Sequence, residues 1–133
     1  MSERFKFVMP GNPEHIQTIR LTIGAIASGL GFDVEEIDDI KTAVGEACQL
    51  VFCHEMEGWS KEYTLDVETE PGRIAVRVEN TSQELMEKTF KKCLDCPNEG
   101  ELGKLLIGAL MDSVEIDCSD KNHKTISMTK TKK

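Results

Sequence analysis

The chain has 133 residues, the size of one average domain, and this length is sufficient to bury a core without disulfide bonds. Its net charge of −8 produces a field that repels nucleic-acid backbones and anionic lipid surfaces. No apolar run approaches the roughly 20 residues of a membrane-spanning helix, and the odd count of 5 cysteines suits a reducing compartment. We therefore expect a single domain over residues 1–133 in the cytoplasm, with neither nucleic acid nor membrane as a partner.

The N-terminal part of the chain predicts a strand and a helix. Phe5 and Phe7 alternate with charged residues, which is the period-two pattern of a half-buried strand. From Pro13 to Gly31, apolar residues recur at three- and four-residue steps, and this spacing predicts a helix with one apolar stripe. Small residues in the second half of this helix leave it narrow, so another element can pack closely against its backbone.

A second helix and a β-hairpin follow. Asp33 and Glu36 match a capping box, and an apolar stripe continues from there toward a stop at Gly58. Residues 63–67 and 74–78 alternate between apolar and polar side chains on either side of a Pro-Gly turn. This pattern predicts two antiparallel strands.

The C-terminal part predicts one more long helix and a second pair of strands. Periodicity weakens between residues 80 and 99, which indicates a short capped helix or a surface loop. Residues 100–111 are almost wholly apolar in their second half, so we expect a helix that is buried on most sides. Residues 114–118 and 126–128 alternate again. The order of elements predicts an α/β (α+β) two-layer sandwich, in which helices cover one face of a mainly antiparallel mixed sheet.

One face of the second helix carries candidates for catalysis. Glu46, Leu50 and His54 follow one another at four-residue steps and share a face rotated away from the apolar stripe. This face can hold a carboxylate as a general base and an imidazole, although a leucine lies between them. The alternative is an amphipathic helix with an exposed acid and histidine, which is a common arrangement.

The stretch "NEGELGKLL" places Gly100 and Gly103 at the start of a helix. Unpaired backbone amides at such a start can receive a phosphate group. Two glycines with this spacing also occur at simple junctions between a loop and a helix, and the stretch matches neither a Walker A loop nor a dinucleotide fingerprint.

Cys93 and Cys96 form a C-x-x-C motif, in which two thiolates can share one zinc ion or one disulfide bond. No second pair has ligand spacing, so a complete metal site needs ligands from Cys48, Cys53, Cys118 or the histidines. Cys48 and Cys53 can equally serve as small apolar residues in the core of the second helix. The motif leaves open a thiol or zinc sensor.

Three segments together resemble the RsbW-type anti-sigma factors, small serine kinases with the histidine-kinase-like (GHKL) ATPase fold. They are "RLTIGAIASGLGFDVEEIDDIKTAVGEAC", "GELGKLLIGALMDSVEI" and "TISMTK". The resemblance implies ATP and magnesium as cofactors, and a homodimer that binds a sigma factor, an anti-sigma-factor antagonist protein, or both.

The family's second helix carries the pattern E-A-x-x-N-x-x-x-H, whose acid activates the attacking group and whose asparagine holds magnesium. Glu46, Ala47 and His54 match this pattern, and Glu46 takes the catalytic position. Leu50 stands where the asparagine belongs. Since magnesium requires oxygen ligands, a leucine removes one contributor to the metal site.

Both glycine boxes of the family also differ here. Asn80 and Ser82 replace the aspartate and glycine that surround the adenine amino group, so a charge is lost. In the second box Glu101 replaces a glycine and adds negative charge beside the expected phosphates. The residues of that box that match, and that would contact nucleotide, are Gly100, Leu102 and Gly103.

Family members use the first helix for dimerisation and for holding the sigma factor, and an arginine on it touches the partner. Arg20 occupies the matching position, with an ordinary surface ion pair as the alternative. We predict a regulatory protein of the anti-sigma type that acts by binding proteins, with weak or lost ATP binding. The alternatives are an active ATP-dependent serine kinase of an antagonist protein, and a thiol or zinc sensor.

Overall fold

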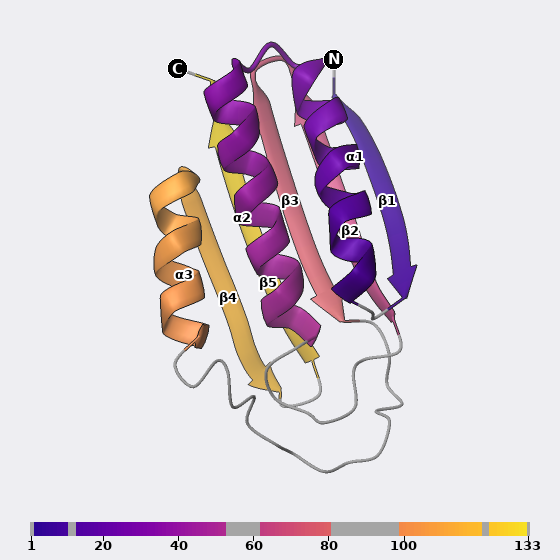
Figure 1. Cartoon of the computed structure of the whole chain (residues 1–133), viewed down its shortest axis with the longest axis vertical. Coiled ribbons are helices and arrows are strands. Elements are labelled where there is room, and N and C mark those ends of the chain that lie inside the picture. Colours follow the sequence, from indigo (N-terminus) through magenta and orange to yellow (C-terminus); the bar gives the residue numbers. More distant parts are fainter. Residues whose placement is uncertain (1, 11–12, 53–61, 81–98, 121–122, 133) are drawn as a thin grey trace.

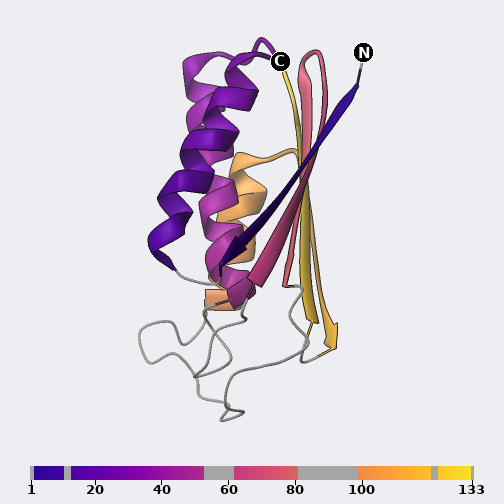
Figure 2. The same ribbon diagram turned by 90° about the vertical axis from the view of Figure 1, so that its right-hand side faces the viewer.

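The computed structural model describes residues 2–10, 13–52, 62–80, 99–120 and 123–132. Five strands form one sheet in the order β1-β2-β3-β5-β4, and every pairing in it is antiparallel. Helices α1, α2 and α3 lie side by side on one face of this sheet, and its other face carries no helix among the described residues (Figures 1 and 2). This arrangement confirms the predicted two-layer sandwich.

The elements follow the predicted order along the chain. The strands and helices are β1 (Glu3–Pro10), the 3-10 helix η1 (Pro13–His15), α1 (Ile16–Ser28), α2 (Val34–Phe52), β2 (Glu62–Glu70), β3 (Arg73–Asn80), α3 (Glu99–Leu110), β4 (Ser113–Asp120) and β5 (His123–Thr131).

The turn between α1 and α2 depends on two local features. Gly29 caps α1, and Gly31 follows with a φ of +92°, which L side chains rarely adopt. The capping box is confirmed at the start of α2: the Glu36 amide donates to Asp33 Oδ1 at 2.8 Å, and the Asp33 amide donates to Glu36 Oε1 at 3.0 Å. Gly58, the predicted stop of this helix, lies outside the described residues.

The β2–β3 hairpin turns at Gly72, whose φ is +75°. Its register pairs Val67 with Val76, so both face the helices. The Gly72 amide also donates to the Leu30 carbonyl at 2.9 Å, which joins this turn to the α1–α2 turn. One end of the molecule is therefore held by a backbone hydrogen bond between two turns that are distant in the sequence.

The core lies between the helices and the sheet. Its only aromatic rings among the described buried residues are those of Phe32 and Tyr63, and the rest is mainly aliphatic, as the few aromatic residues of the sequence suggest. The largest side chains with almost no exposure are Tyr63, Ile19, Ile23, Ile40, Leu65, Ile74, Ile107, Ile126 and Met128. Close packing of these side chains provides the main stabilisation of the fold.

Helix α3 is less buried than its composition predicts. Leu105 is 71% exposed and Leu106 is 39% exposed, while Ile107 is fully buried. The expectation of burial on most sides is therefore wrong. The physical reason is position, because α3 covers β4 at the edge of the sheet and contacts α2 on one side only (Figure 1).

The predicted short helix or loop between residues 80 and 99 falls almost entirely outside the described residues. Within the described part of the chain, no helix is both long enough and apolar enough to cross a membrane.

Candidate functional site

The candidate nucleotide site lies at one end of the sandwich, where several elements converge. The C-terminal part of α2, the N-terminal turn of α3 and the last residue of β3 all lie at this end (Figure 1). Helix α2 carries Glu46 and Leu50, α3 carries the glycines, and β3 ends at Asn80. The topology thus brings the three predicted parts of the site to one end of the molecule.

Glu46 lies on the side of α2 that faces α3. Asp39 precedes Glu46 by seven residues and therefore lies on nearly the same side of the helix. Its Oδ2 is 3.8 Å from Lys130 Nζ. Lys130 in turn donates to the carbonyl of Leu110 at the end of α3, at 2.6 Å. Glu46 is half-buried, and Leu50 follows it one turn later. A carboxylate therefore lies on the side of α2 toward the helix that begins with the glycine-rich segment.

Helix α3 begins at Glu99, so Gly100, Glu101 and Leu102 lie in its first turn. The amides of a first turn have no partner within the helix and favour negative charge. Gly103 is buried, whereas the next residue, Lys104, is exposed. The backbone of this segment suits an anion, but the Glu101 side chain brings a competing negative charge to the same turn.

The residues present fit a magnesium–ATP complex poorly. Position 50 supplies no oxygen ligand, position 80 supplies an amide in place of a carboxylate, and position 101 adds an acid. Among the residues that the structure describes, no group of three or more His, Cys, Asp and Glu side chains is placed to hold a metal ion. His54, Ser82, Cys93 and Cys96 lie outside the described residues, so their predicted roles stay predictions.

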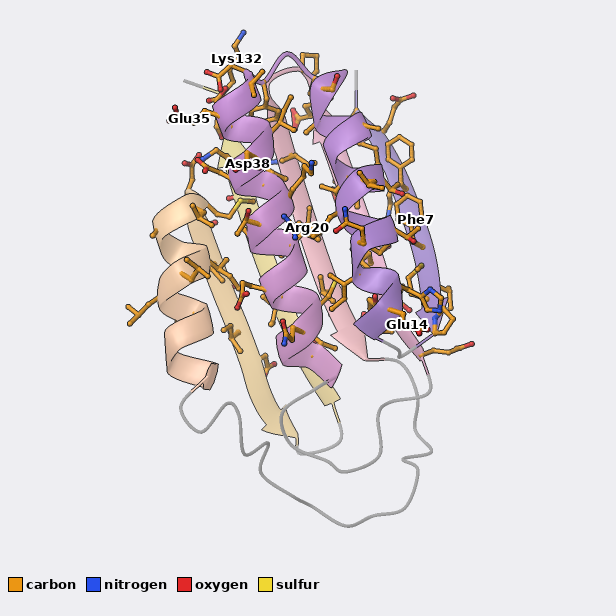
Figure 3. The ribbon with its side chains drawn as sticks, in the orientation of Figure 1. Phe7, Glu14, Arg20, Glu35, Asp38 and Lys132 are labelled. Carbon is orange, nitrogen blue, oxygen red and sulfur yellow. The ribbon has the colours of Figure 1, made fainter. Side chains whose placement is uncertain are left out.

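Arg20 lies at the contact between α1 and α2, on the side of α2 away from α3 (Figure 3). A Cβ placed on Gly45 would be 3.1 Å from Arg20 Cδ, so the stem of the arginine crosses the α2 backbone at this glycine. Its Nε is buried and has no hydrogen-bond partner in the described part of the chain. Arg20 therefore forms no surface ion pair among the residues with described side chains, which was the alternative role predicted for it.

Cys48 is a core residue of α2, as the apolar interpretation of this cysteine expected. Its side chain is fully buried, and burial raises the pKa of the thiol to about 12, an effect that a hydrogen bond from Tyr63 partly offsets. Burial is also the main cause that raises the pKa of Tyr63, with the neighbouring Cys48 as a further cause. A thiol with so high a pKa is unreactive at neutral pH.

The described residues also line a hollow of about 400 Å³ on the open face of the sheet, away from the helices. Arg4 and Asp66, both in its lining, form an ion pair at 3.1 Å. This hollow lies on the face opposite to Glu46 and is separate from the candidate site.

Sequence reasoning missed two groups of residues. Lys41 and Gly45 complete the surroundings of Arg20, and Lys130 with Asp39 fixes the end of α3. The signal in the sequence was Gly45, inside the apolar pattern of the second helix. A glycine in a helix interior is roughly 1 kcal/mol less favourable than alanine, so its presence usually has a packing reason. No sequence signal pointed to Lys130, because its burial depends on the tertiary fold.

Comparison with known proteins gives a consistent result. Residues 9–130 match the family model described as "Histidine kinase-like ATPase domain". The chain is 31% identical over 142 residues to the serine-protein kinase RsbW of Bacillus pumilus, covering 92% of this chain and 82% of that protein. It is also 31% identical to RsbW of Bacillus subtilis over 134 residues, covering 93% of this chain and 81% of that protein.

A solved structure agrees with the fold. The crystal structure of the RsbU and RsbW domains of a Mycobacterium tuberculosis protein superposes with a TM-score of 0.72 at 16% identity, covering 97% of this chain and 32% of that chain. The sandwich with helices on one face, the positions of Glu46 and the α3 glycines, and these similarities lead to one assignment. The chain belongs to the RsbW family of histidine kinase-like ATPase domains.

Proposed function

We propose that this chain is a single-domain cytoplasmic regulator of the anti-sigma type, which acts by binding protein partners and binds ATP weakly or not at all. The observation that carries this proposal is Leu50, one turn after Glu46 on the α3-facing side of α2. Its partners are a sigma factor, an antagonist protein of the anti-sigma factor, or both, as the family resemblance implies.

The chemistry of magnesium supports the loss of nucleotide binding. Magnesium demands near-ideal octahedral coordination by oxygen, and a leucine side chain has no oxygen to offer. The acid at position 101 adds repulsion for phosphate at the start of α3. Both substitutions affect the same small site, so their unfavourable effects on the free energy of nucleotide binding reinforce one another.

The surface around α1 and β1 supports binding between proteins. Leu21 on α1 is 57% exposed, and the rings of Phe5 and Phe7 stack with centroids 6.4 Å apart on the partly buried inner face of edge strand β1. Exposed apolar side chains beside an edge strand are characteristic of association surfaces. We infer that this surface forms a homodimer.

Isothermal titration with ATP, ADP and a non-hydrolysable ATP analogue, each with and without magnesium, tests the proposal. We expect no heat at millimolar nucleotide for the natural chain. Leu50→Asn restores the side-chain oxygen and should gain magnesium-dependent binding, whereas Leu105→Asn, on the exposed side of α3, should not. Micromolar, magnesium-dependent binding by the natural chain would overturn the proposal.

The second candidate function is an active serine kinase, favoured by the half-buried Glu46 beside α3 and by the kinase names of the relatives. This function predicts phosphate transfer to a serine of an antagonist protein at saturating ATP. Glu46→Gln should abolish the transfer because it removes the base while keeping the side chain's size. Absence of transfer by the natural chain under the same conditions would remove this candidate.

A further inference from the structure

Strand β4 forms one edge of the sheet. The strand order places it last, and in the described part of the chain it pairs only with β5. Figure 1 shows β4 as the outermost strand on the side of α3. Alternate residues of an edge strand direct their N–H and C=O groups away from the sheet, where a further strand can pair with them. The register with β5 is regular from Ser113 to Asp117, so this stretch presents a regular edge.

A hollow of about 570 Å³ passes around this edge. Its lining includes residues 114–117 of β4 and also Lys104 of α3, which lies on the helical side of the sheet (Figure 2). Arg77 and Ser127, on the open side of the sheet, line the same hollow. Since the sheet is continuous from β3 to β4, a hollow that reaches both of its faces must run along the edge. The described residues therefore leave space beside β4 for an added strand.

The side chains of β4 alternate between acidic and apolar along this edge. Glu115 and Asp117 are exposed on the open face, whereas Val114 and Ile116 are half-buried against the core. Directly opposite side chains of neighbouring antiparallel strands lie about 5 Å apart, and unlike charges there stabilise the pairing. Arg77 lies on β3, which β5 separates from β4, so it does not stand between these acids and an added strand. The edge therefore favours a strand with basic residues on the open face.

Helix α3 favours apolar residues on the other face of an added strand. Gly108 faces β4, because a Cβ placed on it would lie 3.7 Å from Val114 Cγ1. Leu105 precedes Gly108 by three residues, so it lies on nearly the same side of α3, and it is 71% exposed. An added strand beside it would bury this apolar surface. Lys104, in the lining of the hollow, disfavours a basic residue at these inner positions.

We propose that β4 is a strand-addition site, at which an extended segment of a partner protein pairs with residues 113–117. The segment carries lysine or arginine at alternate positions, facing Glu115 and Asp117, and β-branched or other apolar residues between them. Charge complementarity carries this choice, and it excludes β4 of a second copy, since antiparallel self-pairing places acids opposite acids. This site goes beyond the proposed function, because it requires neither nucleotide nor the α1 surface.

A titration of the full ¹⁵N-labelled chain with a short end-capped peptide tests the proposal. In the probe, lysine alternates with valine or threonine, and the control peptide has the same composition with its lysines gathered at one end. We expect the probe alone to shift the amide signals of residues 113–117. Methyl groups on one alternate set of the peptide's amide nitrogens should abolish binding, and methyl groups on the other set should preserve it, because only one set pairs with β4.

Two positions on the open face of the sheet separate the edge from the overall charge. Glu115→Gln should raise the Kd of the probe about threefold and Glu115→Lys about tenfold, because a cross-strand ion pair is first lost and then reversed. Glu68→Gln removes an exposed acid from β2, which is three strands away from β4, and should leave the Kd unchanged. Both positions are exposed, so these variants should fold, and circular dichroism checks this.

Equal binding of the probe and the control peptide would overturn the proposal. Equal increases of the Kd in Glu115→Gln and Glu68→Gln, or equal tolerance of methyl groups on both sets of amides, would also overturn it, because charge alone would then explain the binding.

Sedimentation of the natural chain tests a different occupant of the same edge. Edge strand β1 carries Arg4 and Lys6 at alternate positions, so β1 of a second copy is the competing occupant. An assembly of the natural chain that Glu115→Lys dissociates would overturn the proposed partner segment in favour of a second copy. We expect Glu115→Lys to leave the mass of the natural chain unchanged.

Discussion

At the scale of single residues, Gly24 determines how the Lys41 side chain packs between α1 and α2. We predict that Gly24→Ala raises or preserves thermal stability, because alanine favours a helix over glycine by roughly 1 kcal/mol. The same Cβ would lie 2.9 Å from Lys41 Cδ and must displace that flexible stem, so the gain should be smaller than at an open helix position. Thermal unfolding measures the change in stability.

Gly108→Ala is the matched control for this substitution. Its Cβ would meet only Val114 Cγ1 at 3.7 Å, an ordinary contact, so stability should rise by the full helix preference of alanine. If both alanine variants gained equal stability, the displacement of Lys41 would have no energetic cost.

A second residue-scale prediction concerns the buried thiol of Cys48. Its folded pKa of about 12 lies above the unfolded value of about 8.5, so above about pH 9 the unfolded state releases a proton that the native state keeps. The contribution of this thiol to the free energy of unfolding is fully present below the unfolded pKa. It falls by about 1.4 kcal/mol per pH unit as the pH rises from there toward 12.

Urea unfolding at a series of alkaline pH values measures this slope. The free energy of unfolding of Cys48→Ala should decline less steeply with pH than that of the natural chain. The cavity that alanine creates lowers stability equally at every pH, so it does not affect the comparison of slopes. Parallel declines in the two proteins would contradict the prediction, because they would show that the thiol ionises with the same pKa in the native and unfolded states.

At the scale of elements, Lys130 determines how α3 ends. Its buried ammonium donates to the Leu110 carbonyl at 2.6 Å and lies 3.8 Å from Asp39 Oδ2, so one side chain of β5 joins α3 to α2. Lys130→Met leaves the carbonyl without this donor and should cost about 1–3 kcal/mol of unfolding free energy. Lys132→Met removes an exposed lysine nearby and should change stability by less than about 0.5 kcal/mol.

Chemical denaturation of both variants measures the difference. A loss in Lys132→Met as large as that in Lys130→Met would indicate that net charge, and not the contact with Leu110, is responsible.

Element types were predictable from the sequence because periodicity and caps are local properties. The capping box of Asp33 and Glu36 and the turn at Gly72 formed as their residue types required. The exposure of Leu105 was not predictable, since an apolar pattern does not reveal which helix covers the edge of the sheet. The contact of Arg20 with Gly45 likewise depends on the register between two helices, which no single-helix pattern contains.

At the scale of the whole molecule, the proposed dimer gives a prediction. Leu21→Glu places a charge on the exposed apolar surface of α1 and should convert a dimer to a monomer without loss of helix content. Leu105→Glu, at the 71% exposed position on α3, should leave the dimer intact. Sedimentation or light scattering across a concentration series measures the mass. A natural chain that is monomeric at every concentration would contradict the proposed homodimer.

The candidate site was predictable in outline at this scale. The resemblance identified Glu46, Leu50 and the glycines of α3, and the fold brings their elements to one end of the molecule (Figure 1). The packing of α1 against α2 was not predictable, because Arg20 and Lys41 each lie over a glycine from the other helix. Local sequence therefore predicted the elements of a nucleotide site at this end, whereas the contacts between α1 and α2 emerged only from packing.

The adjacency of Gly45 and Glu46 has a further consequence. Consecutive residues of a helix point about 100° apart, so a single turn of α2 contributes to the contact with Arg20 on one side and to the candidate nucleotide site on the other. A ligand that shifts the α2 backbone at Gly45 also shifts the carboxylate of Glu46. By thermodynamic reciprocity, a nucleotide whose binding depended on the position of Glu46 would alter the affinity of a ligand bound at Gly45 by the same factor.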